Sequence, residues 1–256
     1  MNYKVTVIIP CYNSEKTLEE TMLSVLSQNH EDFEHIIVDG ASKDNTMEIV
    51  KKYEEKYEGK LKYISEPDKG IYDAMNKGIR MATGDIIGLL NSDDKYANNE
   101  VLKTISETVE KTNCDGIHGN LLYMDEETMT KPKRKWVTKS TNIKTGNITA
   151  HPTLYLKKEV YDKLGLYNLK YKVVADYDFM VKLLLNKDIK LVHINEYLIH
   201  MRLGGASSNG LKGYIYNLKE SYRVLKDNNV KYAVIISFIR IIKTVWQMIT
   251  AKFIRK

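Results

Sequence analysis

The sequence contains very little cysteine. Cys11 and Cys114 are the only two cysteines among 256 residues. Two cysteines cannot build a disulfide framework, and no Cys/His cluster supplies the ligands of a zinc site. A reducing cytoplasmic setting is therefore the default expectation.

The chain also lacks a long uncharged apolar run and a strong excess of one charge. Arg240 and Lys243 interrupt the most apolar stretch, which argues against a membrane-spanning helix. The first ten residues form a strand pattern without the regions of a signal peptide, so secretion is not expected. The net charge of +6 suits an anionic partner but is too small to indicate nucleic acid.

Short apolar runs alternate with amphipathic segments along the first part of the chain. The runs predict buried strands, and the intervening segments predict helices of ten to fourteen residues, as expected of an α/β fold with a parallel sheet covered on both faces. The expected strands are Val5–Pro10, His35–Val38, Leu61–Ser65 and Ile86–Leu90, and the expected helices are Glu15–Gln28 capped by Ser14, one that follows Asp44, and Ile71–Met81.

The second part of the chain is less regular but continues to mix strands and helices. The predicted elements are a strand over Gly116–Tyr123, a strand that begins in His151–Leu156, a helix over Lys158–Leu164 closed by Gly165, a helix that starts near Val173, and an edge strand over Ile189–Ile194. The glycine- and serine-rich segment 200–208 is expected to be a loop that can close over a ligand.

Polar residues follow the predicted parallel strands. Asp39 ends the second strand, and Asn91, Asp93 and Asp94 end the fourth. Because ligands bind outside the carboxyl ends of strands in open α/β sheets, these residues predict one shared crevice. The paired carboxylates are interpreted as a metal site, with a simple turn as the alternative.

Six motifs in order resemble the family 2 glycosyltransferases of the GT-A fold. The motifs are Val7–Asn13, Asp39–Thr46, Ile71–Ile79, Ala82–Asp85, Leu90–Asp94 and Ala175–Asp178, and the resemblance covers about residues 3 to 208. It implies a Rossmann-like, mostly parallel sheet flanked by helices, with a nucleotide half over about residues 1–95 and an acceptor half over about 96–208.

The resemblance also implies roles for individual positions. Asp93 is expected to bind Mn²⁺ or Mg²⁺, and Asp176 is expected to be the general base. The nucleotide-binding positions are Pro10, Tyr12 and Asn13 beside the base and ribose, Asp39 as acceptor for a uracil-like imide, and Asp73, Asn91 and Ser92. Contacts to the acceptor or the diphosphate are assigned to His151, Asp178, His200 and Arg202, with a purely structural histidine as the alternative for each histidine.

Two positions depart from the family pattern. Asn91 stands where the metal-binding motif usually has aspartate, so this position brings no charge and is interpreted as a ribose contact. Ala175 stands where a glutamate often precedes the base, and Asp178 is expected to stand in for it in part.

These residues predict an inverting transfer of sugar from a nucleotide-diphosphate donor, with a UDP-sugar favoured. The expected acceptor is a saccharide or a lipid-linked saccharide in surface polysaccharide assembly, and the missing Gln-x-x-Arg-Trp motif argues against a processive synthase. A nucleotidyltransferase is one alternative, although residues 10–13 lack its glycine-rich basic loop. A catalytically silent module that binds sugar nucleotide or membrane is the other.

Residues 209–256 are expected to form a helical extension of the glycosyltransferase domain. Within it, Ala233–Lys256 shows one apolar helical face and only basic charges. Such a helix is typical of an anionic membrane interface, which would place the protein on the inner face of the plasma membrane. Packing on the protein's own core and a homodimer seam are the alternatives. The basic run Lys131–Trp136 is interpreted as solvated surface, with an anionic acceptor contact as the alternative.

Overall fold

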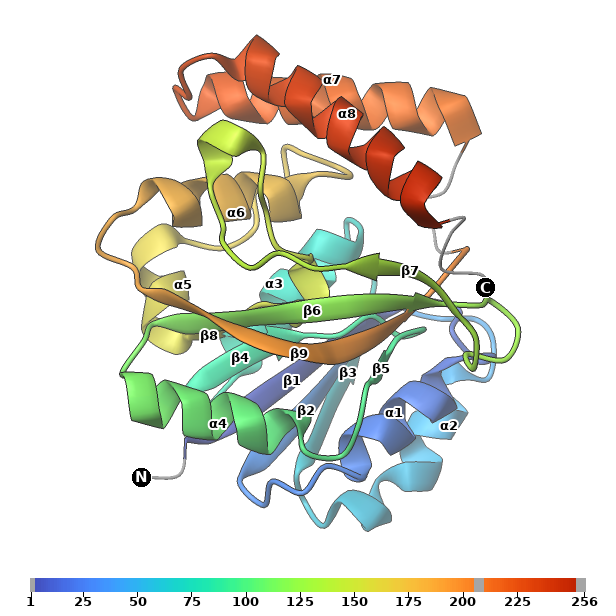
Figure 1. Ribbon diagram of the computed structural model, residues 1–256. Helices are drawn as coiled ribbons and strands as arrows, with labels where there is room; N and C mark the ends of the chain where they lie inside the picture. The colour runs from blue at the N-terminus through green and yellow to red at the C-terminus, as the bar shows by residue number, and fades with distance from the viewer. Residues whose placement is uncertain (1–2, 205–209, 252–256) are drawn as a thin grey trace.

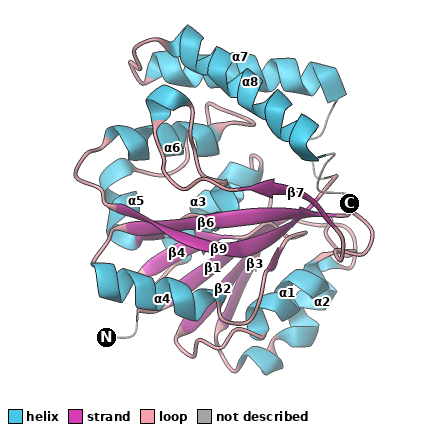
Figure 2. Ribbon diagram, in the orientation of Figure 1, coloured by secondary structure: helices cyan, strands magenta, loops and turns pink. Residues whose placement is uncertain are grey.

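The fold is a single nine-stranded sheet with helices on both faces (Figure 2). The computed structural model describes residues 3–204 and 210–251, with side chains for 3–204 and 215–243. The strand order is β3-β2-β1-β4-β8-β6-β9-β5, and β7 pairs with β6. The strands are β1 Val5–Cys11, β2 Phe33–Asp39, β3 Leu61–Ser65, β4 Ile86–Leu89, β5 Lys95–Tyr96, β6 Gly116–Met124, β7 Pro132–Trp136, β8 Tyr155–Lys157 and β9 Leu191–Arg202.

The parallel sheet predicted for the first part of the chain is confirmed. Strand β1 pairs in parallel with β2 and with β4, and β2 pairs in parallel with β3. Every residue of β1 and β2 is buried, as expected of parallel strands covered on both faces. The pairing of Cys11 with Asp39 brings the carboxyl ends of β1 and β2 together.

Helices cover the two faces of this sheet separately. On one face, α1 Leu18–Leu26, α2 Thr46–Tyr53 and α4 Val101–Thr112 share a hydrophobic cluster that includes Val7 and Ile9. On the other face, α3 Ile71–Met81, α5 Lys158–Leu164 and α6 Ala175–Leu185 share a cluster that includes Ile8. The side chains of β1 alternate between the two clusters, because successive residues of a strand point to opposite faces.

The second part of the sheet is mixed. Strand β8 is antiparallel to both β4 and β6, β6 is parallel to β9, and β5 is antiparallel to β9. The expected edge strand over Ile189–Ile194 is wrong: β9 is longer, reaches Arg202, and lies between β6 and β5. The polar pair Asn195 and Glu196 lies at an irregularity in the β6–β9 register, which hid this continuation from the sequence pattern.

Two other predicted boundaries differ. Residues His151–Thr153 form a 3-10 turn, so β8 begins only at Tyr155. Helix α1 begins at Leu18, because the backbone oxygen of Ser14 accepts hydrogen bonds from Thr17 and Leu18 in a preceding turn. The Ser14 hydroxyl bonds Ser92 instead of capping the helix.

The chain closes with α7 Gly210–Asp227 and α8 Ala233–Ala251, which lie over α6 and β7 (Figure 1). Val224, Leu225 and Ile236 of this extension are buried in the same cluster as α6. Within the described residues, no helix is long and apolar enough to cross a membrane. Residues 205–208 of the predicted loop and 252–256 of the predicted amphipathic helix lie outside the described part.

Candidate active site

Asp39 anchors the loop that follows β2. Its side chain is fully buried, and its two carboxylate oxygens accept hydrogen bonds from the backbone NH of Ser42 at 3.0 Å, the hydroxyl of Ser65 at 2.6 Å and the hydroxyl of Ser42. The thiol of Cys11 lies 3.7 Å from the same group, and burial followed by Asp39 raises the pKa of that thiol. A base imide that binds Asp39 would need to displace one of these donors, and Ser65 at the exposed rim is the most accessible.

The loop after β1 lies against this anchor. The NH of Asn13 donates to the hydroxyl of Ser42 at 2.7 Å, and the Asn13 side chain accepts from the NH of Lys43 at 2.9 Å. Tyr12 is 59% exposed, so its ring is available to stack on a nucleotide base. Pro10, by contrast, is buried within β1, at the point where the strand leads into this loop.

A third loop, after β3, completes the nucleotide side. A Cβ placed on Gly40 would lie 2.6 Å from Oδ2 of Asp68 and 3.4 Å from Cδ2 of Tyr12, so the three loops converge around this glycine. Asp73, in the first turn of α3, accepts a hydrogen bond from the NH of Lys69 at 3.0 Å. In this structure Asp73 therefore shapes the loop from its helix N-terminus, where a carboxylate is favoured.

The residues after β4 form a polar cluster that the sequence predicted. Ser92 is held by the hydroxyl of Ser14 at 2.9 Å and by that of Thr21, which donates to its backbone oxygen at 3.0 Å. The Asn91 amide donates to Oδ2 of Asp94 at 2.8 Å. An asparagine at position 91 can donate this hydrogen bond, which an aspartate could not, and it thereby holds the Asp94 carboxylate in place.

The two carboxylates of this cluster lie in a poorly solvated environment. Asp94 is 1% exposed, and burial together with Asp93 raises its pKa to about 8, despite hydrogen bonds from Asn91 and from the NH of Arg202. Burial also raises the pKa of Asp93, while Arg202 lowers it in part. Such a site gains from a nearby cation, because a cation offsets the cost of burying negative charge.

Arg202, at the end of β9, connects this cluster to neighbouring elements. Its NH donates to Asp94 at 3.0 Å, its Nε to the backbone oxygen of Asp93 at 3.4 Å, and its Nη2 to Glu20 at 2.8 Å. Its Nη1 donates to the backbone oxygen of Glu126. Arg202, predicted from the sequence as a site residue, therefore does contact Asp93. The sequence did not predict that its strand, β9, lies inside the sheet.

His200 lies two residues before Arg202 on the same strand and pairs in register with Lys95. Burial and the Lys95 ammonium lower its pKa, so the ring is neutral near pH 7. Residues two positions apart in a strand point to the same face of the sheet, so His200 lies on the face that carries Arg202.

The donor set fits a hard divalent cation bound together with a diphosphate. Among the described residues, no three His, Cys, Asp or Glu side chains gather as a complete metal cage. Mg²⁺ and Mn²⁺ sites in nucleotide enzymes commonly use one or two carboxylates, with substrate phosphates and water as the other ligands. Asp93 meets this requirement, whereas Asp94 is tied to Asn91 and Arg202 and supports it.

Asp176 lies in the first turn of α6 beside an aromatic cluster. The Tyr72 hydroxyl donates to its Oδ1 at 2.9 Å, although the two residues are 104 positions apart. Burial, followed by Asp176, raises the pKa of Tyr72, so this hydroxyl remains a donor. The sequence did not predict a role for the Tyr72 side chain, because its hydrogen bond to Asp176 depends on the contact between α3 and α6.

His151 belongs to the same cluster through Tyr167. The Nε2 atom of His151 lies 2.7 Å from the Tyr167 hydroxyl, and the Tyr167 ring lies 5.8 Å from that of Tyr72. Tyr167 is clamped by Asn76, which accepts from its NH and donates to its backbone oxygen, both at 2.9 Å. Burial lowers the pKa of His151 and Asp176 partly offsets this, so a neutral ring lies near the carboxylate.

Comparison with known proteins decides the family. The family described as glycosyl transferase family 2 matches residues 6–172, which is more than half of the chain. The chain belongs to glycosyl transferase family 2. The match spans the first five motifs and His151 and Tyr167, whereas Ala175–Asp178 lies just beyond it. The family resemblance first seen in the motifs is confirmed.

Curated relatives of this chain are named as glycosyltransferases, two of them with a biosynthetic pathway in the name. A "PGL/p-HBAD biosynthesis glycosyltransferase" of Mycobacterium bovis is 25% identical over 86% of this chain and 85% of its own length. A "putative teichuronic acid biosynthesis glycosyltransferase TuaG" of Bacillus subtilis is 34% identical over 48% of this chain and 49% of its own length.

Solved structures confirm the GT-A fold. TarS 1-349 of S. aureus in complex with UDP-GlcNAc superposes with a TM-score of 0.67 at 23% identity, and covers 87% of this chain and 64% of the TarS fragment. The mannosyltransferase PcManGT from Pyrobaculum calidifontis, in complex with GDP-Man and Mn²⁺, superposes with a TM-score of 0.69 at 15% identity over 99% of this chain and 74% of its own. This chain thus spans less than two thirds of the TarS fragment.

Asp178 does not join the site of this glycosyltransferase. Its side chain is buried, forms an ion pair with Lys182 at 2.6 Å, and accepts a hydrogen bond from Asn228 of the helical extension at 2.7 Å. Residues two positions apart on a helix point about 200° apart, so Asp178 faces away from Asp176. Asp178 therefore does not supply the carboxylate that is missing at position 175, and the hydroxyl that contacts Asp176 comes from Tyr72.

Proposed function

We propose that this chain is an inverting, metal-dependent glycosyltransferase that transfers a sugar from a nucleotide-diphosphate donor, with a UDP-sugar favoured. The acceptor is a saccharide or a lipid-linked saccharide of a surface polysaccharide. One observation carries the proposal: Tyr72 and Asp73 are adjacent on α3, and Tyr72 contacts Asp176 while Asp73 shapes the nucleotide loop. The first turn of α3 therefore places the expected base beside the expected donor site.

The comparisons support the donor class without determining the sugar. One neighbouring structure holds UDP-GlcNAc and another holds GDP-Man with Mn²⁺. Relatives named for PGL/p-HBAD and teichuronic acid biosynthesis support a saccharide or glycolipid acceptor. For this chain, the favoured uracil base rests on Asp39 and its exchangeable partner Ser65.

The protein's own groups divide the chemistry in a simple way. Tyr12 stacks on the base, the loops around Gly40 hold the ribose, and Arg202 and Asp93 lie where the diphosphate is expected. Asp93 would hold the divalent cation, which would supply positive charge to stabilise the leaving diphosphate. Arg202 adds a fixed positive charge at the same place.

Asp176 then acts on the acceptor. Its Oδ1 is bonded to Tyr72, which orients the carboxylate and leaves Oδ2 for the acceptor hydroxyl. As the acceptor oxygen bonds to the anomeric carbon, the bond from that carbon to the diphosphate oxygen breaks, and the hydroxyl proton passes to Asp176. A single displacement of this kind inverts the anomeric configuration, and a positioned base contributes about 10²–10⁴-fold to the rate.

A donor panel tests this function. The purified protein is incubated with UDP-, GDP-, dTDP- and CMP-sugars in Mn²⁺, Mg²⁺ or EDTA, and the released nucleotide is quantified. We expect UDP from at least one UDP-sugar with Mn²⁺ or Mg²⁺ and a large loss in EDTA. The same loss is expected for Asp93→Asn, while Asp188→Asn, at an exposed site, serves as the charge-matched control.

Two results would overturn the proposal. Binding of UDP without release from any donor, even with acceptor extracts, would favour a silent binding module. Formation of pyrophosphate from a nucleoside triphosphate and a sugar phosphate would favour a nucleotidyltransferase.

A further inference from the structure

Helix α8 presents an apolar face to solvent. Val234, Ile235, Phe238 and Ile242 are 66%, 56%, 63% and 54% exposed, respectively. Ile236, on the opposite side, is 2% exposed and packs into the cluster of α6. A contiguous exposed patch of this kind on a soluble surface marks an interaction site.

The basic residues of α8 do not lie in solvent beside this face but turn toward the protein. The Arg240 guanidinium lies 3.7 Å from the centroid of the Tyr177 ring. The Lys243 ammonium donates to the backbone oxygen of Thr145 at 2.8 Å and also bonds the side chain of Asn147. The helix therefore places its cations over the acceptor half of the enzyme.

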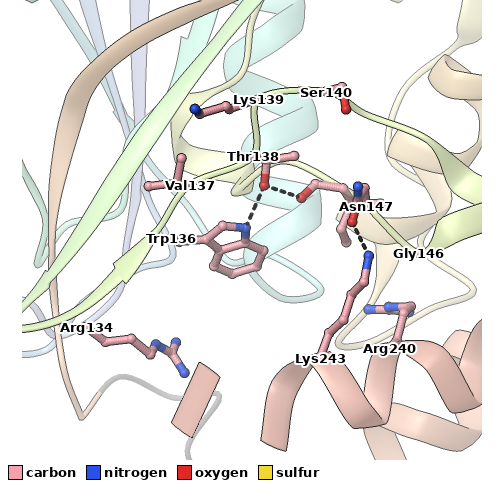
Figure 3. Close-up of a pocket in the computed structure, with 11 residues that line it drawn as sticks. Arg134, Trp136, Val137, Thr138, Lys139, Ser140, Gly146, Asn147, Arg240 and Lys243 are labelled. Carbon is pink, nitrogen blue, oxygen red and sulfur yellow. Dashed lines mark hydrogen bonds between the residues drawn. The ribbon is translucent and has the colours of Figure 1, made fainter. Parts of the chain in front are cut away.

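These cations line a cavity of about 300 Å³ between α8 and the segment that follows β7 (Figure 3). Arg134, Lys139, Arg240 and Lys243 contribute four positive charges to its wall, and no acidic residue appears among the described lining residues. Trp136 lies between Arg134 and Lys243 in the close-up, with its indole NH bonded to Thr138 at 3.1 Å. The basic run that contains Arg134 is thus only partly solvated surface.

The cavity has the properties of a site for a multiply charged anion. A concave site lined by one sign of charge concentrates ions of the opposite sign. Guanidinium groups match phosphate geometry, and Arg134 and Arg240 supply two of them to the cavity wall. Lys243 and Arg240 are already oriented by Asn147 and Tyr177, so little ordering is needed on binding.

The cavity is connected to the catalytic side by two short links. Tyr177, under Arg240, directly follows Asp176 in α6. Asn147 and Ile148, in the cavity wall, precede His151 by three or four residues. The cavity wall and α8 therefore adjoin the two chain segments that carry Asp176 and His151.

We propose that this cavity binds the phosphate or diphosphate of a lipid-linked acceptor, with the lipid chain running along the exposed apolar face of α8. The polyanion site lies beneath α8 and the apolar face lies on its outer side. Together they match an amphiphile whose charged phosphate head enters the cavity and whose long chain passes over the helix. The inference rests on the proposed function, since the bound lipid would be the sugar acceptor.

Vesicle flotation with the full-length protein tests this assignment without donor or turnover. Vesicles of phosphatidylcholine carry either polyprenyl phosphate or phosphatidylglycerol, at amounts matched for surface charge. We expect at least tenfold tighter binding to the polyprenyl phosphate vesicles, because the four cations of the cavity converge on one phosphate head while the apolar face of α8 takes the polyprenyl chain. Equal binding to both would overturn the proposal in favour of a general anionic surface.

Charge variants locate the site. Lys139→Glu and Arg134→Gln are expected to abolish the preference for polyprenyl phosphate. The matched controls Lys144→Glu and Lys135→Gln, on the same two segments but outside the cavity, are expected to keep it. Equal loss in variants and controls, or a preference that survives in Lys139→Glu, would overturn the cavity assignment. Lys139 is exposed, so this variant remains informative if Arg134→Gln is unstable.

A second pair of variants tests the apolar face. Phe238→Ser with Ile242→Ser is expected to lower binding to both vesicle types at least tenfold, while Ile215→Ser with Tyr216→Ser on α7 leaves it unchanged. If sedimentation shows a dimer that these α8 changes dissociate, with vesicle binding intact, the face belongs to a second copy and the lipid assignment fails. Because binding is measured without donor, its failure is distinct from failure of glycosyl transfer.

Discussion

Asp176 combines two features that suit a base at the acceptor. Its carboxylate lies at a helix N-terminus, and one oxygen is held by a neutral tyrosine rather than by a cation. A carboxylate neutralised by a lysine or arginine would bind a proton poorly. The nearby His151 is kept neutral by burial, so it does not compete as a charged partner.

We expect Asp176→Asn to lower kcat by about 10²–10⁴-fold, because an amide cannot accept the acceptor proton. UDP affinity by calorimetry should be unchanged, since Asp176 lies on the acceptor side. The residue change preserves shape and the hydrogen bond from Tyr72. A variant with wild-type turnover would contradict the assignment of the base, and Asp188→Asn provides the control for loss of a carboxylate elsewhere.

At the scale of elements, the buried side chain of Glu34 in β2 bonds β1, β3 and the residues that precede β4. Its side chain is 2% exposed and accepts hydrogen bonds from the hydroxyls of Thr6 and Thr83 at 2.7 and 2.8 Å, and from the NH of Gly84 at 3.0 Å. Lys62 of β3 forms an ion pair with it at 2.8 Å. This network sets the start of β4 against β1 and so positions the Asn91–Asp94 cluster at the other end of β4.

This network predicts a pH-dependent stability. Burial raises the pKa of Glu34, but hydrogen bonds from Lys62, Thr6 and Thr83 outweigh it and lower the pKa to about 2 from its ordinary 4.5. Because the folded pKa lies below the unfolded one, the stabilisation is complete above pH 4.5 and is lost as the pH falls toward 2. At pH 7 its upper size is roughly 3 kcal/mol.

Glu34→Gln should therefore lower the free energy of unfolding by up to about 3 kcal/mol at neutral pH. In urea unfolding series, the difference from wild type should narrow between pH 4.5 and 2. Glu48→Gln, at an exposed position on α2, should change little at any pH. A difference that stays constant with pH would show that the ionised carboxylate is not what stabilises the network.

At the scale of the whole molecule, the helical extension shares its core with the glycosyltransferase domain. Val224 and Leu225 are fully buried in the cluster that contains α6, and Asn228 holds Asp178 across the same contact. The helix that carries Asp176 is therefore covered by the extension. We expect the domain and the extension to unfold together rather than as independent units.

Leu225→Ala should lower the free energy of unfolding by about 2–5 kcal/mol, because it removes a fully buried side chain and leaves a cavity. Ile215→Ala, at a position 44% exposed on the same helix, should cost no more than about 0.5 kcal/mol. Both are measured by urea unfolding of the full chain, followed by fluorescence and by circular dichroism. Two separate transitions would contradict the shared core.

The sequence by itself determined the elements that depend on local pattern. Helices Ile71–Met81 and Lys158–Leu164 have the predicted bounds, and the parallel strands occur where buried apolar runs end in polar residues. The strand-end residues Asp39 and Asn91–Asp94 could be named because parallel strands bring their carboxyl ends to one edge. Hydrophobic periodicity, helix capping and turn residues act over a few positions, so the elements that they specify can be predicted without knowledge of the fold.

The tertiary structure alone decided which distant groups meet. Tyr72 reaches Asp176, Arg202 reaches Asp93 from an interior strand, and Asp178 turns to Asn228. Helix α8 directs its cations inward and its apolar face outward. A residue pattern shows which face of an element is apolar, but not which element covers it. That choice depends on packing between segments far apart in the chain, and it distinguishes Asp176, the Asn91–Asp94 cluster and the basic cavity from ordinary surface.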